Sequence, residues 1–357
     1  MVKVKYVPIL KLKAAELSAV KTLSDADKNS ILPFFEAVPS YSIPKKYLEI
    51  SGGDLSKYNS CIKVELDAQN LLTSFGDGVP FIFDTSLLFF NYRQEYLKNF
   101  INNSAKLYLN PIFAISSFDF DVAASIEHYC VKYATRPLFC MRINIKELDD
   151  INSLKTRLSP LLDSFDFYAC VVDLQSSISD DNYKVAARFL SELSIIFGDD
   201  VLLIVSGGSF PKDMSRVRID ASLDERTISR SDYLNWRKIN NSCDVDIIFS
   251  DYSIRHPVYD PSVEFHQSSS TIKYTVGDSW IIYKGSASDK IHYLANAKIL
   301  ADSSEFYGKE HCFGDLFIHE KKLIFEKEGV SSRSTGNATN WLAAGISHHI
   351  KVTIDQI

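Results

Sequence analysis

The sequence predicts an α/β fold, a (β/α)8 barrel of the TIM type that carries a C-terminal hairpin and a helical extension. Eight short apolar runs lie between residues 6 and 251, and each ends close to a polar residue. Unbroken apolar runs are typical of parallel strands, which are covered on both faces. Helical patterns fill the gaps between the runs, as the alternation of strands and helices in such a barrel requires. The runs together span roughly 250 residues, the usual size of this barrel.

The eight predicted strands follow one another in chain order. Their apolar runs occupy residues 6–10, 31–35, 80–83, 109–115, 137–141, 167–172, 201–205 and 245–249. The polar residues that end them are Lys11, Glu36, Asp84, Ser116, Arg142, Asp173, Ser206 and, one position past Ser250, Asp251. All strands of such a barrel run in one direction, so we expect these side chains at one end of it, where barrel proteins keep their sites.

Apolar residues at helical spacing or acidic residues at a helix start mark five of the gaps, namely residues 14–28, 120–133, 147–165, 180–197 and 231–240. The segment 37–79 contains prolines and a glycine pair; it predicts a loop, a helical turn and one helix, with residues 61–66 open to a strand instead. The main alternative fold is a flat doubly wound sheet. That fold usually has a glycine-rich loop after its first strand, and residues 10–16 contain no glycine.

The strand–helix alternation stops after Asp251. Residues 271–284 alternate apolar and polar side chains around Gly277-Asp278, the pattern of an antiparallel hairpin. Residues 288–304 predict a helix that completes the outer ring. We therefore expect a barrel domain over residues 1–304 with the hairpin inserted in it. Residues 305–357 form an extension packed on the barrel, and its last segment, 337–357, begins as a helix.

Composition limits the classes of protein. The chain is 46% hydrophobic and 24% charged, as ordinary globular proteins are, and its net charge of −6 argues against a protein that wraps nucleic acid. No stretch approaches the roughly 18 uncharged apolar residues of a membrane helix. The six cysteines are scattered, with no C-x-x-C pair. We therefore expect a reduced, cytoplasmic protein with no membrane contact.

Several short motifs resemble those of a known family. They are Tyr6-Val-Pro-Ile-Leu-Lys-Leu-Lys-Ala-Ala-Glu16, Leu32-Pro-Phe-Phe-Glu36, Ser209-Phe-Pro211, Asp251-Tyr252, Trp280-Ile-Ile-Tyr-Lys-Gly285, Thr335-Gly-Asn-Ala-Thr-Asn-Trp341 and His348-His349. Nearly end to end, the chain resembles the beta protein family, named after a protein of phage T4. The resemblance implies a phage, prophage or mobile-element setting and implies no established reaction.

The charged residues at the strand ends are the candidate site. Glu36, Asp84, Asp173 and Asp251 are the candidate catalytic residues, and Lys11 and Arg142 are candidates to hold an anionic group of the ligand. Carboxylate oxygens are ligands for Mg²⁺ or Mn²⁺, which suits a phosphate-bearing substrate. A carboxylate pair without metal suits acid–base chemistry such as glycoside hydrolysis. A buried ionic network with a purely structural role is the third interpretation.

The loop Ser206-Gly207-Gly208-Ser209 is the best candidate for a phosphate-binding loop. It follows the seventh predicted strand, where barrels often bind phosphate, and glycine permits close approach of the backbone. A tight turn with positive φ explains the same glycines. Adjacent His348 and His349 point about 100° apart on a helix and are poorly placed to bind one metal together.

Two functional hypotheses follow. The first is a cytoplasmic barrel that binds, and in one version hydrolyses, a phosphate-bearing or nucleotide-like ligand at the C-terminal ends of its strands. The second is a non-catalytic module that contacts a phage or host protein through the hairpin 271–284 and the tail, in antiphage defence or counter-defence. The first requires the charged strand ends to share one pocket. The second predicts that deletion of the tail, with the barrel still folded, abolishes capture of the partner.

Overall fold

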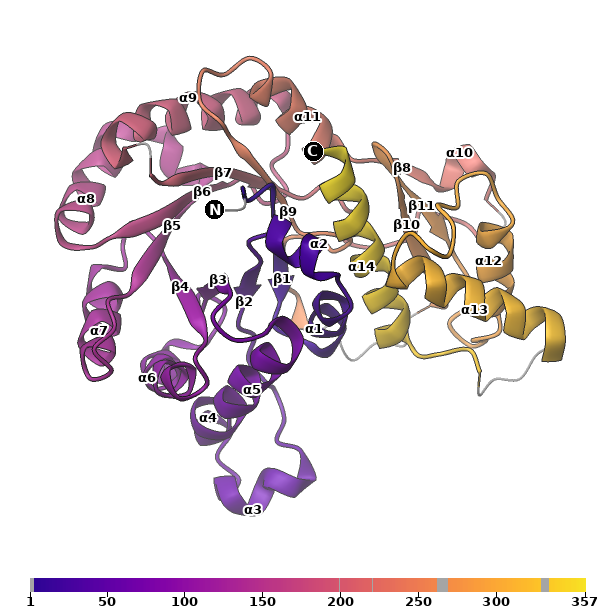
Figure 1. Ribbon diagram of the computed structural model, residues 1–357, viewed down its shortest axis with the longest axis horizontal. Coiled ribbons are helices and arrows are strands. Elements are labelled where there is room, and N and C mark those ends of the chain that lie inside the picture. Colours follow the sequence, from indigo (N-terminus) through magenta and orange to yellow (C-terminus); the bar gives the residue numbers. More distant parts are fainter. Residues whose placement is uncertain (1–2, 199, 220, 262–268, 329–333) are drawn as a thin grey trace.

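The computed structural model describes residues 3–198, 200–219, 221–261, 269–328 and 334–357. Eight parallel strands form a closed barrel in the order β1-β2-β3-β4-β5-β6-β7-β9 (Figure 1). The ring closes because β1 pairs with β2 on one side and with β9 on the other. This confirms the predicted (β/α)8 fold. The barrel strands are β1 Tyr6–Lys11, β2 Phe34–Glu36, β3 Pro80–Asp84, β4 Asn110–Ile115, β5 Leu138–Asn144, β6 Phe167–Asp173, β7 Leu202–Gly207 and β9 Ile248–Asp251.

Alternate residues of each strand face the barrel interior, because side chains along a strand point to opposite faces. One apolar cluster collects every second residue from all eight strands and therefore marks the interior; in β1 these are Val7 and Ile9, and in β6 Ala169 and Val171. The intervening residues, such as Tyr6 and Leu10, join the larger cluster beneath the helices. This alternation decides which polar strand-end side chains enter the barrel.

The helices around the barrel are α1 Ala14–Lys21, α2 Asp25–Ser30, α5 Val64–Phe75, α6 Phe90–Lys106, α7 Phe120–Val131, α8 Ile151–Ser164, α9 Asp180–Phe197 and α11 Ser231–Asn240. The single helix predicted over residues 14–28 is two helices, because Ser24 caps a new one by accepting a hydrogen bond from the Asp27 N–H. Residues 61–66 are helical and not a strand. They lie where the π-helical turn η2 Tyr58–Lys63 runs into α5.

Short elements complete the barrel. They are η1 Lys45–Tyr47, α3 Leu48–Ser51, α4 Leu55–Lys57 and η3 Ile145–Asp149. Helix α3 lies at the tip of a projection at the bottom of Figure 1. No helix of the described residues combines the length and the apolar composition needed to cross a bilayer.

A small antiparallel sheet lies beside the barrel. The predicted hairpin is present as β10 Ile272–Val276 and β11 Ser279–Tyr283, and a third strand, β8 Thr227–Ser229, pairs with β11. Helices α10 Leu223–Arg226, α12 His292–Ala301 and α13 Phe313–Glu328 accompany it. The sheet has an apolar cluster of its own, with Tyr274, Tyr293 and Trp341 among its members. The division of the chain at residue 304 stays a prediction.

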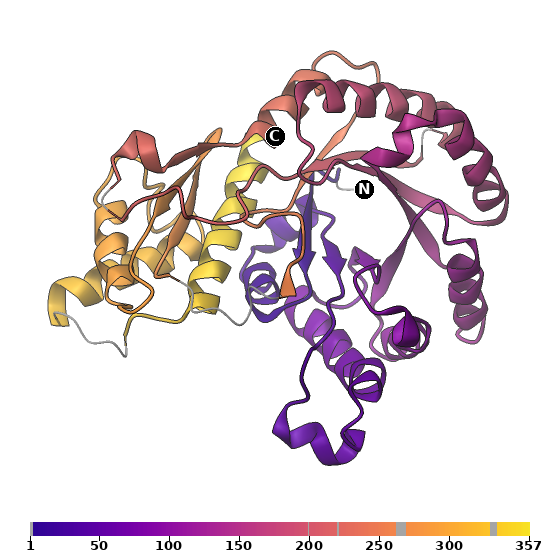
Figure 2. The same cartoon turned by 180° about the vertical axis from the view of Figure 1, so that it is seen from behind.

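The C-terminal helix α14 Ala338–Gln356 lies between the barrel and the small sheet, as both views show (Figures 1 and 2). It is helical along its whole length and packs against α1 of the barrel and against α13 and β10 of the smaller unit. Twelve of its residues are buried, which explains why its sequence is apolar on several faces. The helix therefore connects the two parts of the molecule.

Candidate functional site

Five of the predicted strand-end residues meet inside the barrel at its C-terminal end. They are Lys11, Glu36, Asp84, Arg142 and Asp173, from β1, β2, β3, β5 and β6. Each occupies an interior position of its strand, two residues beyond an interior apolar residue such as Ile9 or Val171. The structure thus brings together five charged side chains that are far apart in the sequence. Their chemical roles stay predictions.

Arg142 is the centre of this charge network. Its Nη1 donates to Glu36 Oε1 at 2.8 Å and also to Asp84 Oδ2. Its Nη2 and Nε donate to Asp173 Oδ2 at 2.7 and 3.1 Å, and Nη2 also donates to the Tyr252 hydroxyl at 2.9 Å. A guanidinium has five N–H donors, and these five contacts use all of them. Arg142 therefore holds the three carboxylates together.

Every oxygen of the three carboxylates accepts a hydrogen bond from the protein. Glu36 Oε2 accepts a hydrogen bond from Lys11, Asp84 Oδ1 accepts one from the Ser86 N–H, and Asp173 Oδ1 accepts one from the Gln175 N–H. Burial raises the pKa of Glu36, but attraction to Lys11 and Arg142 outweighs it and lowers the pKa below its usual value.

The cations are the more accessible members of the network. The carboxylate side chains are 2–3% exposed, against 7% for Lys11 and 14% for Arg142. Lys11 uses one of its three N–H donors on Glu36, and its Nζ lies 5.5 Å from the ring centre of Tyr252. A ligand that approaches the mouth therefore meets positive charge before it meets the acids.

A second lysine and several aromatic side chains form the rim of the mouth. Lys13 Nζ lies 4.7 Å from the ring centre of Tyr259 and Lys11 Nζ lies 5.9 Å from it. Burial and the nearby Arg255 lower the pKa of Lys13 to about 8. Tyr41 and Phe89, both partly exposed, meet edge to face at 5.8 Å. Lys13 is therefore in a dehydrated and electropositive position.

A small cavity of about 10 Å³ lies beside Lys11, between the ends of β1 and β9. Its walls include Tyr252, Arg255 and His256. This volume holds roughly one water molecule or one ligand oxygen atom.

The loop 206–209 lies next to the network but is occupied by the protein itself. The Gly208 N–H donates to the Gln175 carbonyl at 2.8 Å, and the Ser209 N–H donates to Asp232 Oδ2 at 3.0 Å. Neither glycine has a positive φ. Close packing explains them instead, since a Cβ on Gly207 would lie 2.6 Å from the Tyr183 hydroxyl and one on Gly208 would lie 2.5 Å from Pro257. The phosphate-loop interpretation stays a prediction.

Ser206 has a different place from the rest of that loop. It pairs in register with Asp173 on one side and with Ser250 on the other, and all three face the interior. Both serine side chains are fully buried, and within the described part of the chain their hydroxyls meet no hydrogen-bond partner. They therefore offer two polar groups beside the charge network.

The structure places Asp251 apart from the other predicted acids. Its Oδ1 accepts hydrogen bonds from the Tyr6 hydroxyl and the Ser253 N–H, and its Oδ2 lies 3.0 Å from His349 Nε2 and 3.7 Å from Arg230. These groups lie outside the barrel wall, towards α14. Asp251 occupies an outward position of β9 because it is two residues beyond the outward Phe249. It is a link between barrel and α14.

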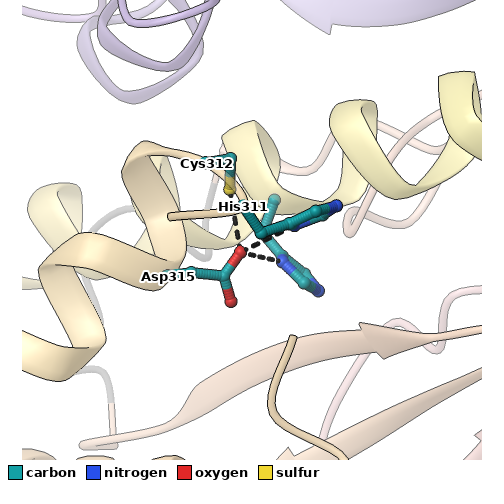
Figure 3. Close-up of side chains that lie close together, drawn as sticks. His311, Cys312 and Asp315 are labelled. Carbon is teal, nitrogen blue, oxygen red and sulfur yellow. Dashed lines mark hydrogen bonds and ion pairs between the residues drawn. The ribbon is translucent and has the colours of Figure 1, made fainter. Parts of the chain in front are cut away.

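A second cluster combines His311, Cys312, Asp315 and His348, and its potential ligand atoms all lie within 4.8 Å of one another. Figure 3 shows the Asp315 carboxylate facing Cys312 and His311. Among the described residues this is the group with metal-ligand chemistry. This cluster was not predicted from the sequence, although His311-Cys312-x-x-Asp315 places three ligand types within five positions. The fourth residue, His348, was considered only with its neighbour His349.

Tyr252 and Tyr259 lie at the mouth and were also not predicted as site residues. The alternation of β9 was the available signal for Tyr252, since this residue follows Ile248 and Ser250 at every second position. Tyr259 lies in a loop, where no periodicity predicts the direction of a side chain.

Comparison with known proteins gives one finding. The model of the family described as beta protein matches residues 6–355, nearly the full chain. No curated protein matches the sequence significantly. The family match covers the barrel, the small sheet and α14 together, so the architecture described above is that of the matched region. The chain belongs to the beta protein family.

Proposed function

We propose that this protein binds a small phosphate-bearing, nucleotide-like ligand at the C-terminal mouth of its barrel. The observation that carries the proposal is the pair of amino groups on Lys11 and Lys13, which lie 5.9 and 4.7 Å from the ring centre of Tyr259, next to a network in which Lys11 and Arg142 bind the acids. A phosphate group supplies negative charge at this point, and the aromatic rim supplies faces on which a base can stack.

The electrostatics support an anion in this position. Arg255, Lys11 and Lys63 all act to lower the pKa of Lys13, whereas Glu16 raises it. The acids below do not offer metal sites without rearrangement, because each of their six oxygens already accepts a hydrogen bond from a protein group. A bound anion therefore relieves repulsion between the lysines and the arginine and needs no change in the network.

The lowered pKa of Glu36 favours ligand binding over hydrolysis with this residue as the general acid. General acid catalysis needs a carboxyl group that holds a proton near the working pH, and the lowered pKa of Glu36 is the opposite condition. We therefore propose ligand binding as the activity. Hydrolysis of the ligand, and any contribution of Mg²⁺ or Mn²⁺, are questions for experiment. We further propose the phage or mobile-element setting and the cytoplasmic location that the family resemblance and the composition suggest.

The apolar side chains of the hairpin in the alternative hypothesis are mostly buried. Trp280, Ile282 and Tyr283 are 0–2% exposed and belong to the protein's own apolar clusters. No observation therefore favours the interaction module over ligand binding, and the idea of a protein partner at the hairpin stays a prediction.

A thermal-shift screen tests the proposal. Inorganic phosphate, AMP, ADP and ATP are added with and without Mg²⁺ to wild type, Lys13→Met and the control Lys106→Met, which changes an exposed lysine at the end of α6. A ligand at 100 times its Kd should add about 2.7 kcal/mol to the stability of wild type and of the control, and much less to Lys13→Met. Equal stabilisation of all three proteins, or of none, contradicts the proposal.

A further inference from the structure

Four side chains that ligate transition metals meet where α13 begins against α14. Three atoms converge on one carboxylate oxygen, Asp315 Oδ2: His311 Nδ1 at 2.9 Å, His348 Nδ1 at 2.9 Å and Cys312 Sγ at 3.0 Å (Figure 3). A carboxylate oxygen has two lone pairs, so three polar atoms within hydrogen-bond distance of this one oxygen is an unusual arrangement. A cation between the four atoms accounts for their convergence.

The histidine tautomers fit a cation. His348 Nε2 lies 2.8 Å from the Thr275 carbonyl, which can only accept, so Nε2 carries a proton. His311 Nε2 lies 3.2 Å from Asp355 Oδ2, another acceptor. In a neutral imidazole the proton on Nε2 leaves a lone pair on Nδ1. When both rings are neutral, both Nδ1 atoms therefore present ligand lone pairs to the centre of the cluster.

The surroundings have the second layer of contacts that metal sites use. Metal-bound histidine almost always donates its other N–H to a carbonyl or carboxylate, here Thr275 and Asp355. Asp315 Oδ1, the oxygen that points away from the centre, accepts a hydrogen bond from the Tyr274 hydroxyl at 2.6 Å. The ring of Tyr274 also stacks on His348 at 3.9 Å. These contacts fix the orientation of three of the four side chains.

The ligand types select the metal. Two imidazoles, a thiolate and one carboxylate suit Zn²⁺, whereas Ca²⁺ and Mg²⁺ take oxygen ligands. A tetrahedral zinc keeps its ligand atoms roughly 3.3–3.7 Å apart, and those of this cluster lie between 2.9 and 4.8 Å apart. Small side-chain movements would close the site.

We propose that His311, Cys312, Asp315 and His348 bind one Zn²⁺ ion in a closed, structural site. Binding releases the thiol proton of Cys312, and four protein ligands leave no open position for a substrate. Asp315 lies in the first turn of α13, His311 and Cys312 lie just before this helix, and His348 lies on α14. The ion therefore ties the smaller unit to the helix that packs on the barrel. His311, with 14% of its side chain exposed, is the route of entry.

Metal analysis and cobalt substitution of the full-length protein test the site. Protein purified without chelator should contain one zinc ion per chain, measured by inductively coupled plasma mass spectrometry. After removal of zinc, Co²⁺ should bind one per chain, with a thiolate-to-cobalt charge-transfer band in the near ultraviolet and the strong visible bands of tetrahedral cobalt. The variants are Cys312→Ser and His311→Gln. Cys243→Ser and His319→Gln are the matched controls, because neither residue belongs to the cluster.

The proposal expects the charge-transfer band to vanish in Cys312→Ser and the affinity for Co²⁺ to fall at least tenfold in both cluster variants. Both controls should behave as wild type. Circular dichroism identifies a variant that does not fold. If Cys312→Ser is unfolded, His311→Gln tests the site instead, because His311 is partly exposed and its substitution disturbs packing less. Wild type that binds no Zn²⁺ or Co²⁺, or a charge-transfer band that Cys312→Ser retains or Cys243→Ser loses, overturns the proposal.

Discussion

Asp251 and Tyr252 are adjacent in the chain and face opposite sides of the barrel wall. The Tyr252 hydroxyl lies inside, where it donates to Asp173 Oδ2 at 2.7 Å and accepts from Arg142. The Asp251 carboxylate lies outside, where it contacts Tyr6, Arg230 and His349. The end of β9 therefore contributes to two buried polar clusters, one beneath the candidate binding site and one between the barrel and α14.

Asp251→Asn should destabilise the protein without loss of ligand binding. The substitution removes the charge that faces buried Arg230, and loss of one partner from a buried ion pair costs about 3–5 kcal/mol. Urea denaturation measures the change. The control Asp246→Asn breaks an exposed pair with Lys3 and should cost less than about 1 kcal/mol. Equal effects of the two substitutions would show that the Asp251 cluster has no special structural role.

Arg142→Met should destabilise the protein in a pH-dependent way. In wild type the lowered pKa of Glu36 contributes stability that is present above its unfolded value near 4.5 and is lost as the pH falls through the folded value. The variant lacks Arg142 and leaves three buried carboxylates with Lys11 alone. The gap in unfolding free energy between wild type and variant should be widest near pH 7 and should narrow on acidification to pH 4. A gap that is constant over this range contradicts the charge network described here.

Lys273→Met should stabilise the protein at neutral and acidic pH. Lys273 donates to the Ile254 carbonyl at 3.1 Å, and burial, with a contribution from Arg255, lowers its pKa to about 7. An unfolded lysine titrates near 10.5, so between pH 7 and 10.5 the unfolded chain binds more protons and stability rises with pH. The variant should have a higher Tm than wild type at pH 6, with a smaller advantage at pH 10. The control Lys106→Met should show no such pH dependence.

Binding of a phosphate ligand should weaken above pH 8. A bound anion favours the charged form of Lys13, whose pKa is about 8 in the free protein, so affinity should fall up to about tenfold per pH unit above that value. Titration calorimetry with ATP at pH 7 and 9.5 measures this change. Lys13→Arg stays charged over the whole range and should lose much less affinity. Parallel pH profiles for the two proteins would exclude Lys13 as the titrating group.

The sequence predicted the barrel well because its strands are buried on both faces, which produces the long apolar runs. It predicted the smaller elements less well. Strand β8 has only three residues, Thr227–Ser229, and two of them are exposed, so no burial pattern marks it. Helix α13 packs against both α12 and α14, and its apolar residues do not follow a single stripe.

The positions of most candidate site residues could be predicted, because side chains alternate along a strand. Side-chain alternation carries Lys11, Glu36, Asp84, Arg142 and Asp173 into the barrel, and their polar character at the strand ends was visible in the sequence. The position of Asp251 depends on the exact register of β9, which the apolar run 245–249 does not define. The metal-type cluster depends on the packing of α13 against α14, and a contact between residues 315 and 348 leaves no local signal.

The location of a bound nucleotide tests the central claim most directly. A crystal structure of the protein with ATP should show phosphate oxygens within hydrogen-bond distance of the ammonium groups of Lys11 and Lys13, and the base against the aromatic rim that contains Tyr41 and Phe89. The network around Arg142 should be unchanged. An ATP molecule bound away from the mouth, or a mouth without ligand under conditions where ATP raises the Tm, would contradict the account.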